Sequence, residues 1–249
     1  MAKTIPPRLY KYQSLTPDPQ THKIYALENL QQRQIWFSKP EKLNDPFDCN
    51  IPFLLKKRVT ENEWEKGYKG LIRRMQNELP PDKLTTALKT AEERYLTNRK
   101  INQRFKDEMI GVNNNNIGNK QQQEFKNYGV ACFSEDFDNI LMWSHYADGH
   151  KGLCLEFDTN YIPFDDVSKV HHVKYRNAYP VISPVAFLTE PIESLTPLIT
   201  KSEEWCYENE WRIILQQPER TEFIYDPKAL TAIYFGCSML KEDIHSKNM

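Results

Sequence analysis

Glycine is scarce in this sequence, and its scarcity excludes several common nucleotide-binding motifs. Eight of the 249 residues are glycine, which is about 3% against a usual share of about 7%. No two glycines have the spacing needed for a Gly-x-Gly turn or a P-loop, and the Gly-x-Ser-x-Gly motif of serine hydrolases is also absent. If the chain binds a nucleotide, side chains must therefore provide the recognition.

An excess of charge of one sign is missing as well. The chain has 33 basic and 34 acidic side chains and a net charge of -1, so it has no overall field that would attract nucleic acid or an anionic membrane. It also lacks a signal-peptide core and any apolar run of membrane-spanning length. We therefore expect a soluble, cytoplasmic protein without a membrane partner.

The five cysteines lack any Cys-x-x-Cys pair and mostly lie within apolar runs. This pattern predicts reduced, buried thiols and does not favour a structural zinc site.

Short aromatic and β-branched runs alternate with turn-forming residues, which predicts short strands. These runs cover residues 9–12, 35–38, 129–134, 152–157, 172–175, 211–215 and 231–235. Helices are expected near 24–33, 139–147 and 192–204, and after the last strand. Because strands and helices do not alternate regularly, we predict an α+β fold with a mixed or mostly antiparallel sheet.

Residues 60–127 are expected to form a helical insert within a single domain spanning 1–249. Thr60 and Glu63 have the spacing of a capping box, and Asp82 is expected to cap a second helix after Pro80-Pro81. The polar segment 113–123 is typical of a surface loop. The insert fits a solvated helix pair or, alternatively, an arm that binds a partner.

The first candidate motif is Phe37-Ser38-Lys39-Pro40-Glu41-Lys42-Leu43-Asn44-Asp45-Pro46-Phe47-Asp48. Asn-Asp-Pro initiates turns, and the Asn and Asp side chains often bond to backbone amides there. A rigid turn after a strand is also a place where a site residue is held. Asn44 and Asp45 are therefore candidates for either role.

The second motif is Met142-Trp143-Ser144-His145-Tyr146-Ala147-Asp148-Gly149-His150-Lys151-Gly152, at an expected helix-to-strand corner. Histidine changes charge near neutral pH, so His145 or His150 could transfer a proton or bind a ribose or phosphate oxygen. Their spacing differs from that of a zinc-binding helix, so no metal site is predicted. Each histidine could equally be a hydrogen-bonded structural residue.

The third motif is Trp205-Cys206-Tyr207-Glu208-Asn209-Glu210-Trp211-Arg212-Ile213-Ile214-Leu215. If the whole run is a strand, alternation places Glu208, Glu210 and Arg212 on one face. The alternatives are a salt bridge between exposed strands or a functional pair of acids. The neighbouring aromatic residues indicate partial burial, where unpaired carboxylates are costly.

In their order and spacing, these motifs resemble a bacterial family catalogued only as a domain of unknown function, the twenty-nine seventy-one family. The resemblance is carried by the three motifs and by Cys132-Phe133-Ser134, and it extends over residues 8–240. It names no activity, although members fit a role as bacterial toxins or phage-defence effectors. Members continue past the expected last helix into a further strand, which has no counterpart here.

The layout is also similar to that of the ADP-ribosyltransferases, which cleave the nicotinamide–ribose bond of NAD. An early aromatic and basic strand, a Phe-Ser element and a late Glu-x-Glu occur in the same order in that superfamily. The resemblance implies that NAD is the substrate, that Glu210 grips the ribose, and that Arg212 and His145 bind anion and ribose. The full set of candidates comprises Glu210, Glu208 and His145 as catalytic residues and Tyr10, Tyr12, Ser38, Asn44, Asp45, Tyr146, His150 and Arg212 as substrate-binding residues.

Two other functions remain open from the sequence. Asp45, Asp48, Glu208 and Glu210 could gather Mg²⁺ in a nuclease or phosphodiesterase. The chain could also be a binding or sensing module without chemistry, in which residues 60–111 contact a partner.

Overall fold

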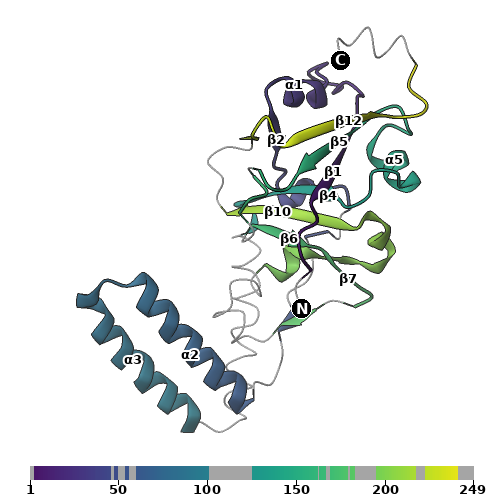
Figure 1. Cartoon of the computed structure of the whole chain (residues 1–249). Coiled ribbons are helices and arrows are strands. Elements are labelled where there is room, and N and C mark those ends of the chain that lie inside the picture. Colours follow the sequence, from purple (N-terminus) through teal and green to yellow (C-terminus); the bar gives the residue numbers. More distant parts are fainter. Residues whose placement is uncertain are drawn as a thin grey trace. The chain divides into compact units, whose positions relative to one another are not determined.

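Six strands form one antiparallel sheet in the order β12-β5-β1-β4-β10-β6 (Figure 1). The strands of this computed structural model are β1 Arg8–Gln13, β4 Tyr128–Ser134, β5 Leu153–Asp158, β6 Val170–His172, β10 Glu210–Gln216 and β12 Leu230–Phe235. The sheet and its accompanying helices confirm the predicted α+β class with a mostly antiparallel sheet.

The structure describes residues 3–45, 48–49, 54–55, 60–100, 125–161, 163–166, 169–178, 180–182, 195–216 and 222–240. The chain divides into two compact units. The first comprises Met1–Asp48, Lys126–Asn177 and Lys201–Met249, and the second comprises Cys49–Phe125 and Ala178–Thr200.

The smaller elements of the first unit surround the sheet. Helix α5 (Ile140–Tyr146) begins after Asn139, whose side chain accepts the backbone N–H groups of Leu141 and Met142 and so caps the helix. The other elements are α1 Tyr25–Gln31, the strand pair β2 Gln34–Trp36 and β11 Glu222–Ile224, η1 Pro40–Lys42, the pair β7 Lys174–Arg176 and β9 Thr200–Ser202, and η3 Glu203–Glu208.

The second unit contains the two long helices α2 (Glu61–Glu78) and α3 (Pro81–Lys100). Thr60 and Glu63 form the predicted capping box at the start of α2. Asp82 lies inside the first turn of α3 rather than before it, because the helix begins at Pro81. Pro at the first helical position is favoured, since its missing N–H would have no partner there. This unit also contains η2 (Thr196–Ile199) and a parallel pair of short strands, β3 (Leu54–Leu55) and β8 (Val181–Ile182).

The two faces of the six-stranded sheet differ in chemistry because successive side chains alternate along each strand. One face forms the main core, which includes Leu9, Phe133, Phe157, Trp211 and Ile213. The opposite face carries tyrosines and polar side chains and is packed in part by α5. Its residues on β1, β4 and β10 include Tyr10, Tyr12, Cys132, Ser134, Glu210 and Arg212.

The sheet opens between its two central strands. Strand β1 pairs with β5 along six residues but with β4 only at Tyr10 and Ser134. Farther along β4, Val130 instead exchanges two backbone hydrogen bonds of 2.9 Å with Ser38. This fork allows side chains to line an opening in the middle of the sheet.

The region before β10 differs from the prediction. The expected helix over 192–204 is wrong within the described residues, where η2, β9 and the start of η3 take its place. Pro197 lies in the first turn of η2, and the β-branched Ile199 and Thr200 lead into extended backbone. Residues 205–215 do not form one strand either, because Asn209 adopts a left-handed conformation with φ 42° and ends η3 before β10 begins at Glu210. The expected strand over 172–175 is split between β6 and β7.

All five cysteines are free thiols. Cys49 and Cys154 are buried as predicted, but Cys206 and Cys237 are exposed. A 3-10 helix has three residues per turn, so Trp205 and Glu208 share one side of η3 and Cys206 lies on another. Cys237 lies in the turn after β12. The predicted loop at 113–123 and the body of the predicted terminal helix lie outside the described residues.

Candidate functional site

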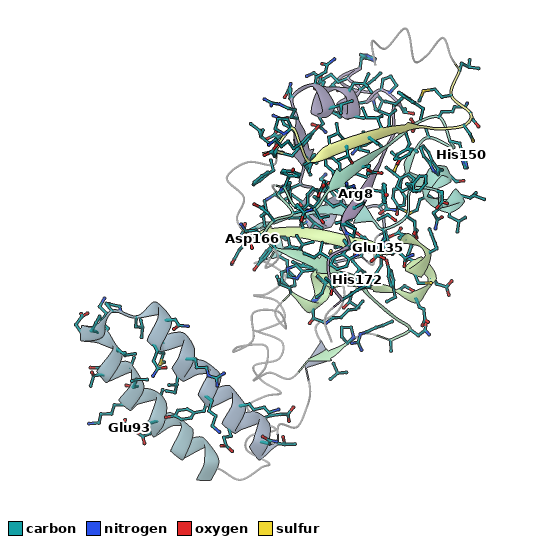
Figure 2. All side chains as sticks on the ribbon, in the orientation of Figure 1. Arg8, Glu93, Glu135, His150, Asp166 and His172 are labelled. Carbon is teal, nitrogen blue, oxygen red and sulfur yellow. The ribbon has the colours of Figure 1, made fainter. Side chains whose placement is uncertain are left out.

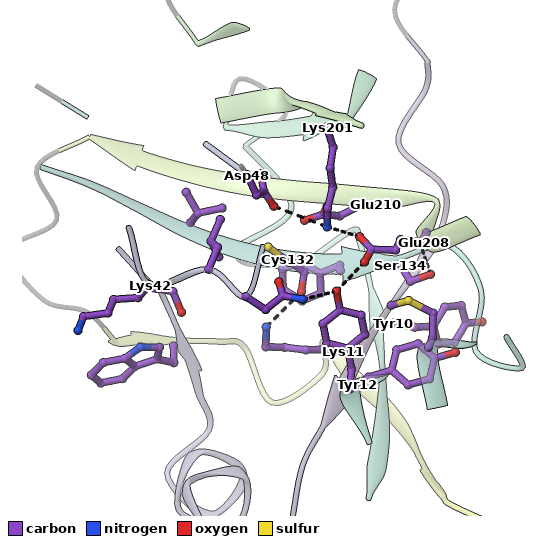
Figure 3. A pocket seen from close by; sticks show the side chains of 18 residues that line it. Tyr10, Lys11, Tyr12, Lys42, Asp48, Cys132, Ser134, Lys201, Glu208 and Glu210 are labelled. Carbon is purple, nitrogen blue, oxygen red and sulfur yellow. Dashed lines mark hydrogen bonds and ion pairs between the residues drawn. The ribbon is translucent and has the colours of Figure 1, made fainter. Parts of the chain in front are cut away.

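A pocket of about 250 Å³ lies at the fork between β1 and β4, and every residue that lines it belongs to the first unit (Figure 3). The lining residues come from β1, β2 and the segment after it, β4, α5, β9, η3 and β10. The lining residues are Tyr10, Lys11, Tyr12, Trp36, Ser38, Lys42, Leu43, Asn44, Asp48, Val130, Cys132, Phe133, Ser134, Met142, Tyr146, Lys201, Glu208 and Glu210.

Lys201 draws three carboxylates together at one end of this pocket (Figure 3). Its ammonium Nζ lies 2.5 Å from Glu208 Oε2, 3.4 Å from Glu210 Oε2 and 3.6 Å from Asp48 Oδ2. Lys201 and Asp48 are each 4% exposed. Charges so far from water persist only when they are paired, so these residues depend on one another.

Arg212 forms an ion pair with Glu210 but is not part of the pocket lining. The two residues are separated by one position on β10 and therefore share a face. Arg212 Nε donates to Glu210 Oε1 at 2.8 Å, and one terminal nitrogen donates to Glu210 Oε2 at 2.9 Å and to Asp48 Oδ2 at 2.6 Å. Arg212 is fully buried. Such a two-pronged contact makes the pair geometrically rigid.

The two glutamates have opposite pKa shifts. Burial by itself raises the pKa of Glu210, but the charges of Arg212 and Lys201 outweigh it and lower the pKa to about 2. For Glu208, burial and the negative charge of Glu210 raise the pKa, and Lys201 only partly offsets them. Burial lowers the pKa of Lys201, yet the surrounding carboxylates raise it above its ordinary value. Of the two glutamates, Glu208 is therefore the one whose negative charge is less fully neutralised by neighbouring cations.

Glu208 is held by contacts on both carboxylate oxygens. Tyr146 donates its hydroxyl to Glu208 Oε1 at 2.6 Å, and Asn44 Nδ2 donates to the Tyr146 oxygen at 2.9 Å. Burial, followed by the charge of Glu208, raises the pKa of Tyr146, so the hydroxyl stays a donor. Ser134 fixes the backbone by donating to the Glu208 carbonyl at 2.7 Å. Motifs far apart in sequence therefore meet at this one side chain.

Lys11 forms another wall of the pocket. Its Nζ donates to the Cys132 carbonyl at 3.1 Å and lies 5.1 Å from the centre of the Phe133 ring. Burial lowers the pKa of Lys11, while it raises that of the Cys132 thiol. Lys42 and Trp36 are more exposed and lie at the pocket rim. The pocket therefore combines an acidic end with basic side chains elsewhere on its walls.

The pocket-lining residue Asp48 has one buried acceptor without a partner among the described residues. Asp48 Oδ2 binds Arg212, whereas Asp48 Oδ1 has no hydrogen-bond partner among the described residues. An unsatisfied buried oxygen typically costs about 1–3 kcal/mol. A donor group on a ligand could satisfy this oxygen.

The pocket unites seven of the eleven site residues expected from the sequence. Glu208 and Glu210 contribute carboxylates, and the other five line the walls, namely Tyr10, Tyr12, Ser38, Asn44 and Tyr146. Arg212 is in contact with Glu210 but lies behind the pocket lining.

The other three expected residues, like Arg212, lie outside the pocket lining. His145 is exposed and has ring contacts with Tyr146, Trp205 and Tyr207. His150 hydrogen-bonds Ser144 instead. Asp45 accepts the backbone N–H of Asp48 through its carbonyl oxygen at 3.0 Å.

Sequence reasoning did not single out Lys201, Lys11 or Ser134 as site residues. A lysine in a charged chain carries little signal on its own, and Lys201 lies in a segment expected to be helical. The serine after Cys132-Phe133 was part of a recognised motif, which was the strongest available hint.

The carboxylate cluster does not have the arrangement of a metal site. Within the described part of the chain, no group of three or more His, Cys, Asp or Glu side chains is arranged to hold a metal ion. The Lys201 ammonium occupies the place between Asp48, Glu208 and Glu210 that a cation would need. The site can therefore bind through side-chain charges, hydrogen bonds and aromatic walls.

Comparison with known proteins gives one result. A family model described as a protein of unknown function (DUF2971) matches residues 142–213. The match runs from α5 into β10 and includes Tyr146, Lys201, Glu208, Glu210 and Arg212. The matched range is shorter than the range 8–240 over which the sequence motifs resemble this family. Neither the curated proteins nor the solved structures contain a match.

Among the residues that the structure describes, no helix is both long and apolar enough to cross a bilayer.

Proposed function

We propose that the pocket binds NAD and cleaves its nicotinamide–ribose bond, as an ADP-ribosyltransferase or NAD glycohydrolase. The observation that carries this proposal is the position of Glu208. Its carboxylate is buried at a pocket wall, oriented by Tyr146 and Lys201, and less neutralised than Glu210.

The charges around the pocket match the two ends of this substrate. When all are ionised, the acids Asp48, Glu208 and Glu210 exceed the cations Lys201 and Arg212 by one charge. This acidic end would face the positively charged nicotinamide ring and ribose. Lys11 and the rim residue Lys42 would face the negative diphosphate.

The pocket volume fits the reactive end of a dinucleotide. At about 250 Å³, it is near the lower end of the range of about 300–1000 Å³ for small-molecule sites. We therefore expect the nicotinamide and its ribose to enter while the adenosine remains outside. The aromatic walls formed by Tyr10, Tyr12 and Tyr146 would stack on the ring and exclude water.

The chemistry requires stabilisation of a positive charge. As the bond breaks, nicotinamide leaves as a neutral molecule with the bonding electron pair, and the ribose becomes oxocarbenium-like. A fixed carboxylate stabilises that charge and can accept a hydrogen bond from a ribose hydroxyl. Water or another acceptor then bonds to the ribose carbon and loses a proton.

We assign the ribose-gripping role to Glu208 rather than to Glu210. Arg212 binds both oxygens of Glu210 and, together with Lys201, lowers the pKa of Glu210, whereas the pKa of Glu208 is raised. Glu210 and Arg212 would therefore position Lys201 and Asp48. The unsatisfied Asp48 Oδ1 would accept a hydrogen bond from the carboxamide of nicotinamide. His145 has no contact role in this arrangement.

The test measures nicotinamide release from NAD by the purified full-length chain, together with NAD affinity by calorimetry. We expect release by the native chain and a loss of at least about 100-fold in Glu208→Gln, because the variant removes the stabilising charge. Glu204→Gln is the matched control, since Glu204 is exposed on the same 3-10 helix.

Binding without nicotinamide release would reduce the proposal to an NAD-binding module. The absence of any NAD affinity would refute the proposal altogether.

A further inference from the structure

A second cluster of reactive side chains lies at the corner between α5 and β5, outside the pocket lining. It consists of Cys237, His150 and Ser144. The Cys237 sulfur lies 3.8 Å from His150 Nδ1, and His150 Nε2 lies 3.0 Å from Ser144 Oγ. Cys237 is exposed, and His150 lies beside α5 (Figure 2). The three side chains form a continuous relay from the helix to an accessible thiol.

The hydrogen bonds determine which nitrogen of neutral His150 carries the proton. Ser144 uses its only hydroxyl hydrogen to bond the Ile140 carbonyl at 2.8 Å. Its oxygen must therefore accept the hydrogen bond from His150 Nε2–H. This leaves Nδ1 with a lone pair directed at the Cys237 thiol, as a general base requires.

The surrounding backbone holds the thiol against this nitrogen. The Ser238 N–H donates to the His150 carbonyl at 2.9 Å, and the Gly236 N–H donates to the Gly152 carbonyl at 3.0 Å. A side chain at Gly236 would collide with the His150 backbone. The His150 ring also stacks against Trp143, with ring centres 6.5 Å apart and an angle of 16°. Both partners are thus fixed in place.

We propose that Cys237 is a site of reversible thiolation by small disulfides, with His150 as the base. His150 Nδ1 accepts the thiol proton, and the resulting thiolate attacks one sulfur of the disulfide. A new sulfur–sulfur bond forms at Cys237 while the original one breaks. The departing thiolate takes the proton from His150, so one thiol and one disulfide are consumed and one of each is produced.

The chain contains a natural reference thiol for this proposal. Cys206 is also exposed, but it has no side-chain hydrogen bond within the described ranges. A difference in reactivity between the two exposed cysteines therefore reports the effect of the histidine rather than accessibility alone.

The experiment uses Ellman's reagent, which is itself a disulfide, on two full-length variants. Cys206→Ser leaves Cys237 as the exposed thiol, and Cys237→Ser leaves Cys206. We expect Cys237 to react at least about tenfold faster at neutral pH, as base activation predicts. Mass spectrometry after treatment with oxidised glutathione should locate the adduct at Cys237.

A histidine variant tests whether the His150 ring itself, rather than the surrounding structure, increases the reaction rate of Cys237. His150 has φ 68°, a conformation that asparagine tolerates, so His150→Asn in the Cys206→Ser chain should fold and lower the Cys237 rate to that of Cys206. His22→Asn is the matched control, because His22 is exposed and has φ 57°, and it should leave the rate unchanged. Equal rates for the two cysteines, or no effect of His150→Asn in the folded chain, would overturn the proposal.

Discussion

Glu156 and Glu208 have similar hydrogen-bond partners but opposite pKa shifts. Glu156 on β5 accepts hydrogen bonds from Tyr234 at 2.7 Å and Thr231 at 2.6 Å and lies 3.4 Å from Arg8. Glu208 accepts from a tyrosine and a lysine. Burial raises the pKa of Glu156, but its hydrogen bonds and Arg8 outweigh this and lower it, whereas the pKa of Glu208 is raised.

The difference shows that hydrogen-bond and ion-pair partners alone do not determine the pKa of a carboxyl group. The Glu156 side chain is 16% exposed and water stabilises its charge, whereas that of Glu208 is 3% exposed. Glu208 also has a second carboxylate, Glu210, beside it. A glutamate and a tyrosine thus form a contact with a lowered carboxyl pKa at the partly exposed Glu156 and one with a raised carboxyl pKa at the buried Glu208.

Removing the cationic partner of each glutamate should cause the largest loss of stability. We expect a much greater loss at the Glu208 site than at the Glu156 site. Lys201→Met leaves three buried carboxylates without their shared ammonium, so we expect a loss of about 3–5 kcal/mol of unfolding free energy. Arg8→Met should cost less than about 1 kcal/mol, because Arg8 contributes to a partly exposed pair. Urea unfolding of both variants measures the difference, and equal losses would contradict it.

Acid should destabilise the buried cluster through Glu210. The folded pKa of about 2 lies below the ordinary value of 4.5, so the stabilisation is complete above about pH 4.5 and is lost as the pH falls toward 2. The shift corresponds to about 3 kcal/mol. Unfolding free energies measured across this range should fall less steeply in Glu210→Gln. A profile unchanged by that substitution would show that other groups control acid unfolding.

Removing the tyrosine hydroxyl should change the pH profile of nicotinamide release at the Glu208 site but not at the Glu156 site. Tyr146→Phe removes a hydrogen bond that lowers the pKa of Glu208, so the acid limb of nicotinamide release should move to higher pH. We expect a loss of about tenfold near neutral pH, the scale of one charge-assisted hydrogen bond. Tyr234→Phe, which changes only the Glu156 site, should leave the profile in place. Identical profiles for both variants would argue against Glu208 as the active acid.

The smallest effect is expected at the hydroxyl of Thr231. Thr231→Val removes one exposed hydrogen bond to Glu156, which should cost no more than about 1 kcal/mol. Thermal unfolding provides the measurement. A larger loss would mean that the Glu156 site is more strongly coupled than its exposure indicates.

Local patterns in the sequence predicted most elements of the first unit. Strands β4 and β10 are rich in apolar, β-branched and aromatic residues, and Asn139 marks the start of α5. These signals act over a few residues, so they are visible without knowledge of the fold.

The arrangement of the site could not be predicted in the same way, because it depends on contacts between residues far apart in the sequence. Lys201 meets Asp48 across about 150 positions in the chain, and no sequence feature marks that pair. The left-handed Asn209 separated Glu208 from the strand, so its approach to Lys201 could not follow from strand alternation. Asn44 was visible as a turn residue, but its bond to Tyr146 emerged only from the fold.

The fork described above also divides the sheet into two halves of three strands. Among the described residues, backbone pairing connects β12-β5-β1 with β4-β10-β6 only where Tyr10 meets Ser134. Contacts such as that between the rings of Phe133 and Phe157, whose centres are 5.9 Å apart, therefore hold the halves together. Because Phe133 belongs to the main core and also lines the pocket, a smaller residue there should change the pocket wall as well as weaken the core.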